Sequence, residues 1–199
     1  MNYLKTYRVA YGLYLQLEHK RREKQPEVFA RLAFNSADQQ LVLAPMDTTP
    51  GGEVHLTLTV PVYIVTGTST AAFNVAISVT YGTLDRRTHK LPVPVLAGSD
   101  SGEPSVLILE IKAKELSSAM NICRGPAKER SLGELEVKIE FENQQQAKWE
   151  ITAKYGLAVR SDADEALLDG WINNATARPP GTRSIQLDFS AISWIPREL

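Results

Sequence analysis

The sequence predicts an all-β protein: an antiparallel two-sheet sandwich, jelly-roll-like in outline, with two short connecting helices. Apolar and polar residues alternate over most of the 199 residues, which is the period of a strand with one buried face. Clusters of glycine, proline, serine and aspartate separate these runs, as they do in all-β proteins. Only two segments have apolar residues at helical spacing. We therefore expect residues 1–199 to form a single β-sandwich domain.

The first half of the chain contains several strand-like runs. Residues 53–84, EVHLTLTVPVYIVTGTSTAAFNVAISVTYGTL, are expected to form a hairpin of two long strands. The first run of the chain begins near Thr6, where Tyr7, Val9 and Tyr11 open an alternating pattern that continues to Leu17. Besides the hairpin, strands are expected at 7–17 (the run just described), 28–34, 41–44, 91–96 and 105–113.

The second half shows the cleanest alternation. Over residues 135–142, leucine, valine, isoleucine and phenylalanine alternate with charged residues, and the pattern resumes over 149–159 and 185–191. Residues 112–126 and 161–175 have helical spacing instead. The first of these helices is expected to stop at Gly125 and Pro126, and the second to begin in a capping box of Asp162 and Glu165.

Pro61 interrupts the first strand of the expected hairpin. It has no N–H group to give to a neighbouring strand, so we expect this strand to lie at a sheet edge or to be bulged there. Beyond the proline, Val62 and Ile64 continue the inner face, but Tyr63 and Val65 make the outer face apolar as well. An apolar outer face requires a cover, and we predict that Pro61, Tyr63 and Val65 lie at a subunit interface.

The composition excludes several classes of chemistry. Three histidines stand apart from one another without metal-ligand spacing, and no glycine-rich phosphate loop or catalytic pair occurs, so we expect no catalytic residue, metal site or cofactor. One cysteine, Cys123, forms no disulfide within the chain, which is typical of a reducing compartment. The amino-terminal residues lack the order of a signal peptide, and no run is long enough for a transmembrane helix.

Basic residues gather in three segments expected to be loops. With 22 basic and 23 acidic side chains the chain is close to neutral, which disfavours a dedicated nucleic-acid binder but allows a local patch. Loops that met at one end of the sandwich would form a patch for RNA or an anionic membrane. No aromatic residues interleave them, so base stacking is not indicated. The basic residues are Lys20, Arg21, Arg22 and Lys24, then Arg86, Arg87 and Lys90, and finally Lys128 and Arg130.

The architecture resembles the jelly-roll coat proteins of small RNA viruses. The resemblance covers residues 53–82 and 134–195, with their long Val/Thr/Ile strands, the loops VTGTST and PPGTRS, and helices confined to connections. It implies a self-assembling viral coat subunit whose main partner is itself, located in the virion or the host cytoplasm. Many such proteins begin with a basic arm that binds RNA, and this chain departs from them because its first strand starts near Thr6.

Two alternatives stay open at the sequence level. The basic segments also suit a viral matrix or movement-type protein that binds membrane or RNA. A cellular ligand-binding β-sandwich for carbohydrate or peptide would need an exposed aromatic patch. Trp171 and Trp194 are the candidates for that patch, although core packing explains them as well.

Overall fold

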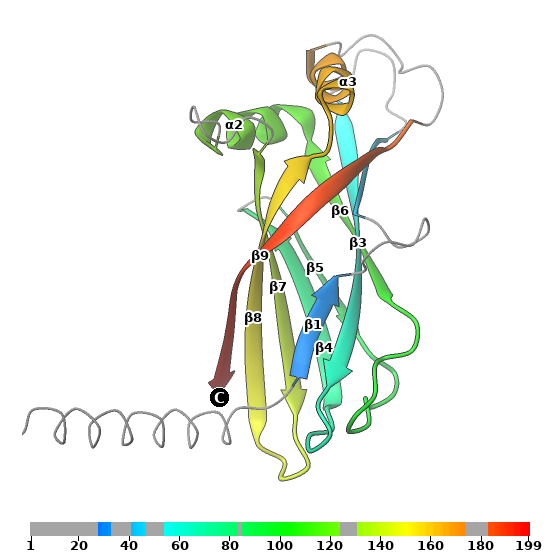
Figure 1. Ribbon diagram of the computed structural model, residues 1–199, viewed down its shortest axis with the longest axis vertical. Helices are drawn as coiled ribbons and strands as arrows, with labels where there is room; N and C mark the ends of the chain where they lie inside the picture. Colours follow the sequence, from blue (N-terminus) through cyan, green and yellow to red (C-terminus); the bar gives the residue numbers. More distant parts are fainter. Residues whose placement is uncertain (1–27, 33–40, 47–53, 83–84, 124–130, 174–182) are drawn as a thin grey trace, which may run out of the picture.

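The computed structural model describes residues 28–32, 41–46, 54–82, 85–123, 131–173 and 183–199 (Figure 1). Within these ranges the chain forms nine strands and two helices. In chain order they are β1 (Val28–Leu32), β2 (Val42–Pro45), β3 (His55–Thr66), β4 (Phe73–Tyr81), β5 (Asp85–Lys90), β6 (Ser105–Lys112), α2 (Ala113–Cys123), β7 (Ser131–Glu142), β8 (Lys148–Val159), α3 (Asp162–Asn173) and β9 (Ile185–Glu198).

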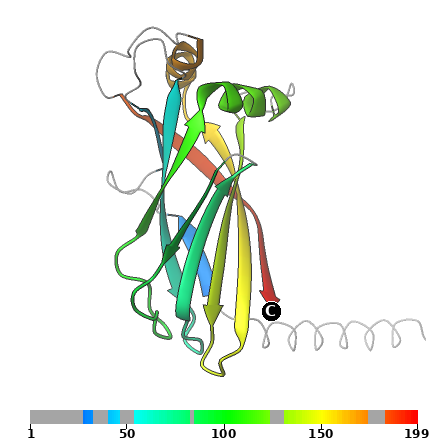
Figure 2. The ribbon, with the colours of Figure 1, turned by 180° about the vertical axis from the view of Figure 1, so that it is seen from behind.

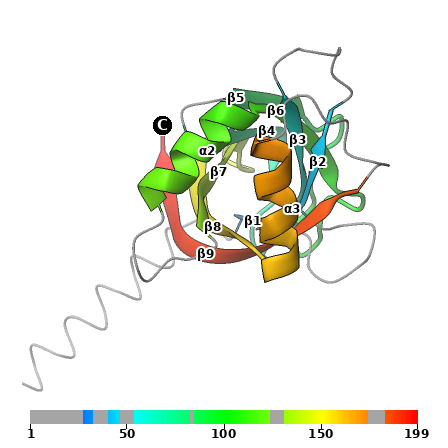
Figure 3. The ribbon, with the colours of Figure 1, turned by 90° about the horizontal axis from the view of Figure 1, so that it is seen from above.

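All the described strands pair antiparallel, and the sheet they form is nearly closed. Its order is β1-β3-β2-β9-β8-β7-β4-β5, with β6 on the remaining edge of β3. Viewed down the long axis, the strands surround a common interior (Figure 3). The prediction of an antiparallel all-β fold with two short connecting helices is confirmed. The pairings trace one barrel-like sheet, however, and do not clearly divide into two sheets or a jelly roll, because β2 bonds to both β3 and β9.

The core fills the inside of this barrel. In β7, Leu135, Val137 and Ile139 are fully buried, and they alternate with partly exposed charged residues, as the sequence predicts. Helices α2 and α3 lie together at one end, which we call the helical end (Figures 1 and 2). Leu116 of α2 and Leu168 of α3 are buried in the same core, so the helices cover that end of the barrel.

The expected hairpin over residues 53–84 is wrong. The two strands, β3 and β4, form as predicted, but they do not pair with each other in the described part of the chain. β3 pairs with β1, β2 and β6, whereas β4 pairs with β5 and β7 on the other side of the barrel. A turn that connects two unpaired strands has the same sequence signals as a hairpin turn, because both need polar and small residues.

The prediction that β3 lies at a sheet edge or is bulged at Pro61 is also wrong. On one side of β3, β2 pairs as far as Thr59 and β1 takes over at Val62, so the proline falls in the break between two partners. On the other side Pro61 lies opposite Val106 of β6. A strand with neighbours on both sides tolerates proline here because a break in the ladder, like an edge, leaves a position where no N–H is needed.

Two further expectations need correction, and one is not tested. Residues 91–96 form no strand, apart from one isolated bridge between Ala72 and Val95, and the prolines at 92 and 94 explain this because neither has an N–H. Ser161, not Asp162, caps α3: its Oγ accepts a bond of 3.2 Å from the backbone N–H of Asp164. The expected strand at 7–17 lies outside the described residues.

Candidate functional site

The strand register brings apolar side chains from β3 and β6 together on the outside of the barrel. Residues directly opposite each other in an antiparallel pair lie on the same face of the sheet. Pro61 is opposite Val106, and Thr59 is opposite Ile108. We call the resulting surface the β3–β6 outer face. Its apolar members are Pro61, Tyr63, Val65, Val106 and Ile108.

The two residues from β6 are the most exposed members of this face. Val106 is 56% exposed and Ile108 is 52% exposed, while Tyr63 and Val65 are half-buried and Pro61 is buried. The sequence predicts the three β3 residues of this face but not the two from β6. A signal was present: the run SVLILEIK is apolar on both of its phases from residue 106 to 109, which a strand with one solvated face does not require.

A polar rim borders the β3–β6 outer face toward the helical end. Glu110 and Lys112 follow Ile108 on the outward phase of β6, opposite Thr57 and His55 of β3. Arg87 of β5 reaches Glu110, with 3.7 Å between the guanidinium nitrogen and the carboxylate oxygen. Both side chains are about half exposed, so this pair adds little stability. An apolar centre with a polar margin is the usual anatomy of a protein–protein contact.

The predicted basic patch is only partly visible. Arg86, Arg87 and Lys90 are exposed, but they belong to strand β5 and not to a loop, which corrects the prediction. Opposed residues of β4 show that Arg86 and Lys90 share the outer face while Arg87 takes the inner phase. The other predicted members, Lys20, Arg21, Arg22, Lys24, Lys128 and Arg130, lie outside the described residues.

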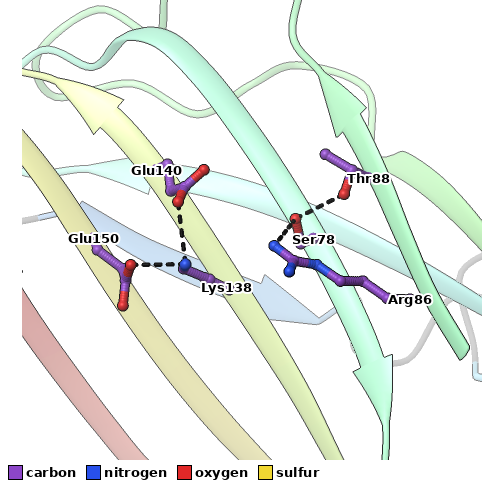
Figure 4. Close-up of polar contacts among 6 residues, drawn as sticks. All are labelled: Ser78, Arg86, Thr88, Lys138, Glu140 and Glu150. Carbon is purple, nitrogen blue, oxygen red and sulfur yellow. Dashed lines mark hydrogen bonds and ion pairs between the residues drawn. The ribbon is translucent and has the colours of Figure 1, made fainter. Parts of the chain in front are cut away.

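Arg86 takes part in a small polar cluster on the outer face of β4 and β5. The Ser78 hydroxyl shares a bond of 2.9 Å with the Thr88 hydroxyl, and the Arg86 guanidinium donates to the Ser78 hydroxyl over 3.4 Å (Figure 4). This cluster holds the guanidinium against the sheet surface. Lys90 lies further along the same phase and is exposed.

Neighbouring strands carry a nearly neutral ladder of charges. Lys138 of β7 lies 2.7 Å from Glu150 of β8 and 3.1 Å from Glu140 on its own strand (Figure 4). Lys138 donates hydrogen bonds to Glu150 and to Glu140, in that order of importance, and these bonds raise the pKa of Lys138 above its ordinary value. Lys154 lies 3.9 Å from Glu136 in the next rung. Alternating signs of this kind suit a solvated face and create no field that would attract an anion.

The described residues offer little other chemistry. Among them, no group of three or more His, Cys, Asp or Glu side chains comes together as a metal site would require. Trp171 is buried in the core and Trp194 packs against it, so both have the packing role that the sequence also allows. Neither of the two described helices has the length and apolar character needed to cross a bilayer. Comparisons with models of known protein families, with curated proteins and with solved structures found no match for this chain.

Proposed function

We propose that the protein is a self-assembling structural protein, a viral coat subunit that forms a shell through contacts between copies. One observation carries the proposal: Val106 and Ile108 are more than half exposed on the outside of paired strands, with Pro61 directly opposite Val106 and Tyr63 next on the same face of β3. Single exposed apolar residues are ordinary on protein surfaces. A group on two adjacent strands is typical of an interaction site.

The rigidity of the surface supports the same proposal. β3 has partners on both edges, and near its end the loop at 99–101 adds further bonds, among them one from the Thr66 N–H to the Ser99 carbonyl of 2.9 Å. Side chains on such a strand lose little freedom when a second protein covers them. A preorganised face binds with less entropy loss than a mobile loop does, and this favours repeated, identical contacts.

The jelly-roll assignment and the location in the virion or the host cytoplasm belong to this proposal as well. Long antiparallel strands around one core, with helices restricted to connections at one end, are the features that support the resemblance to coat proteins. The partner implied is another copy of the chain, and no small molecule or cofactor takes part.

The size of the purified protein tests the proposal. Sedimentation velocity and electron microscopy over a range of salt and pH are expected to reveal assembled particles, and a strictly monomeric protein under every condition would refute it. Tyr63→Asp is expected to weaken assembly while the subunit stays folded, since it puts a carboxylate on the β3–β6 outer face. Tyr63→Phe keeps the apolar area and serves as the matched control. If Tyr63→Asp leaves the particles unchanged, this face is not the contact.

A matrix or movement-type protein is the second candidate, and the exposed side chains of Arg86 and Lys90 on the same face of β5 favour it. Binding of basic residues to phosphate releases counterions, and the free energy gained from this release falls as the salt concentration rises. Co-sedimentation with RNA and with anionic liposomes is therefore expected to fall with increasing salt. The absence of binding even at low salt would remove this alternative.

A further inference from the structure

Three turns of the chain lie together at the end of the barrel opposite the helical end (Figures 1 and 2). They follow β3, β5 and β7 and comprise residues 67–72, 91–99 and 143–147. The backbone N–H of Gly98 donates to the carbonyl of Gly67 over 2.7 Å, which joins the first two turns. The third turn lies beside the first, because Phe73 of β4 pairs with Glu142 of β7. We call these three segments the turn end.

The turn end contains no charged side chain. Its segments read GTSTAA, LPVPVLAGS and NQQQA, whereas Asp, Glu, Lys and Arg make up 23% of the whole chain. Charged residues are mostly found on protein surfaces, and moving one of them out of water is costly. The turn end can therefore leave water without the desolvation of any charge.

The second of these turns carries two strongly exposed apolar side chains. Val93 is 64% exposed and Leu96 is 65% exposed. Val95 is buried instead, and it exchanges two backbone hydrogen bonds of 2.9 Å with Ala72. The Leu96 carbonyl accepts a bond of 2.6 Å from the Ser99 hydroxyl. These bonds fix the backbone of the turn while Val93 and Leu96 project from it.

Backbone polar groups of the turn end have partners within the protein. In the third turn, the Asn143 side chain accepts bonds of 3.0 Å and 2.9 Å from the N–H groups of Gln145 and Ala147. In the second turn, Pro92 and Pro94 have no N–H group to satisfy. A backbone group that is bonded inside the protein loses little when water is removed. The turn end thus meets a condition for contact with an apolar medium.

Charges of both signs begin directly beyond the turn end. Lys90 precedes the second turn and Asp100 follows it, and Glu142 and Lys148 flank the third. Asp100 is exposed and lies opposite Val65, so it separates the apolar side chains of the turn end from the β3–β6 outer face. A border of mixed sign suits lipid headgroups that carry both a phosphate and an amine, and it favours neither sign of membrane charge.

We propose that the turn end inserts into the surface of a lipid bilayer, with Val93 and Leu96 among the acyl chains. A stable contact between two proteins buries about 800 Å² on each partner. The turn end instead presents separate tips (Figure 2), and a rigid partner would touch little more than these. A fluid bilayer closes around each tip, so binding follows the apolar area inserted. This inference goes beyond the assembly proposed above and does not depend on it.

Flotation of the full chain with phosphatidylcholine vesicles tests the inference, because vesicle-bound protein floats while assembled particles sink. These vesicles carry no net charge, so binding is expected at low and high salt alike. The absence of flotation at both salt concentrations would overturn the inference. Flotation that disappears as salt rises would overturn it as well, since basic residues would then hold the protein to phosphate.

Three substitutions locate the contact. Leu96→Ala removes three carbon atoms from a side chain that is 65% exposed, and it is expected to weaken vesicle binding about tenfold. Leu96→Asp places a carboxylate at the tip and is expected to abolish binding. Ile192→Asp is the matched control, because Ile192 is 53% exposed but lies against Gly156 in the middle of β8. Its binding is expected to stay unchanged, and equal losses in the two Asp variants would contradict insertion through the turn end.

Sedimentation velocity without vesicles distinguishes a bilayer from a second copy of the chain. Leu96→Asp is expected to assemble as the unsubstituted chain does, and altered assembly would mean that another copy covers the turn end, which would refute the inference. If Leu96→Asp does not fold, Leu96→Ala and Val93→Ala ask the same question with smaller perturbations. A monomeric protein that floats with vesicles would remove the proposed shell and leave this inference standing.

Discussion

Truncation of Ile108 gives the sharpest test of the β3–β6 outer face. Complete burial of an isoleucine or valine side chain contributes about 1.5–3 kcal/mol. Ile108 is 52% exposed, so about 1 kcal/mol of this free energy is left for a partner to recover. Ile108→Ala is therefore expected to weaken each subunit contact by about 1 kcal/mol, roughly fivefold in dissociation constant. In Ile108→Asp, the subunit contact would also have to remove water from a carboxylate, so this substitution is expected to abolish assembly.

Ile195→Ala is the matched control. Ile195 is 57% exposed and lies on the outer phase of β9, opposite Thr152 and away from the β3–β6 outer face. Both truncations remove the same atoms, so they are expected to lower the free energy of unfolding similarly, by about 1 kcal/mol. Sedimentation velocity over a concentration series measures assembly, and urea denaturation measures stability. If both variants weaken assembly equally, or if Ile108→Ala has no effect, the reasoning about this face is refuted.

Three further predictions concern the stability of the barrel itself. Tyr81→Phe leaves the buried Leu132 carbonyl without its hydroxyl donor and is expected to cost about 1–3 kcal/mol in urea denaturation; an unchanged midpoint would contradict this. Gly133 has a φ of +107° beside a bulge in β7. Gly133→Ala is therefore expected to reduce the free energy of unfolding by at least about 1 kcal/mol and to lower the melting temperature. An unchanged melting temperature would contradict this expectation. The raised pKa of Lys138 implies stability that is present below the ordinary value of 10.5 and lost at higher pH. Lys138→Met should remove this loss of stability at alkaline pH, measured by urea denaturation. A double-mutant cycle with Glu150→Gln should give a coupling free energy of about 0.5 kcal/mol.

Strands with one buried and one charged face were the easiest to predict. In β7, Val137 is buried and Lys138 lies on the outer surface, so burial and sequence period agree. β5 was missed because its described side chains, among them Arg87 and His89, are all exposed. Such a strand has no buried face, and its backbone pairing with β4 places it in the sheet. The period of the sequence carries no information about a strand of that kind.

The candidate site was predictable where it depends on one strand and unpredictable where it depends on pairing. The apolar outer phase of Tyr63 and Val65 is visible in the sequence without any knowledge of the partner strand. The addition of Val106 and Ile108 requires the register between β3 and β6, whose paired residues are more than 40 positions apart. Long-range register of this kind is set by the barrel as a whole, and local sequence does not encode it.

The position of Pro61 limits how a partner can bind at the β3–β6 outer face. Both edges of β3 are occupied around the proline, so this part of the barrel has no free backbone edge for a further strand. A partner at the β3–β6 outer face must therefore bind through side chains, mainly by apolar burial, which salt weakens little. Substituting Ile108 should therefore change assembly without altering the backbone hydrogen exchange of β3 in the unassembled subunit. Loss of that protection in the Ile108 variants would contradict binding through side chains.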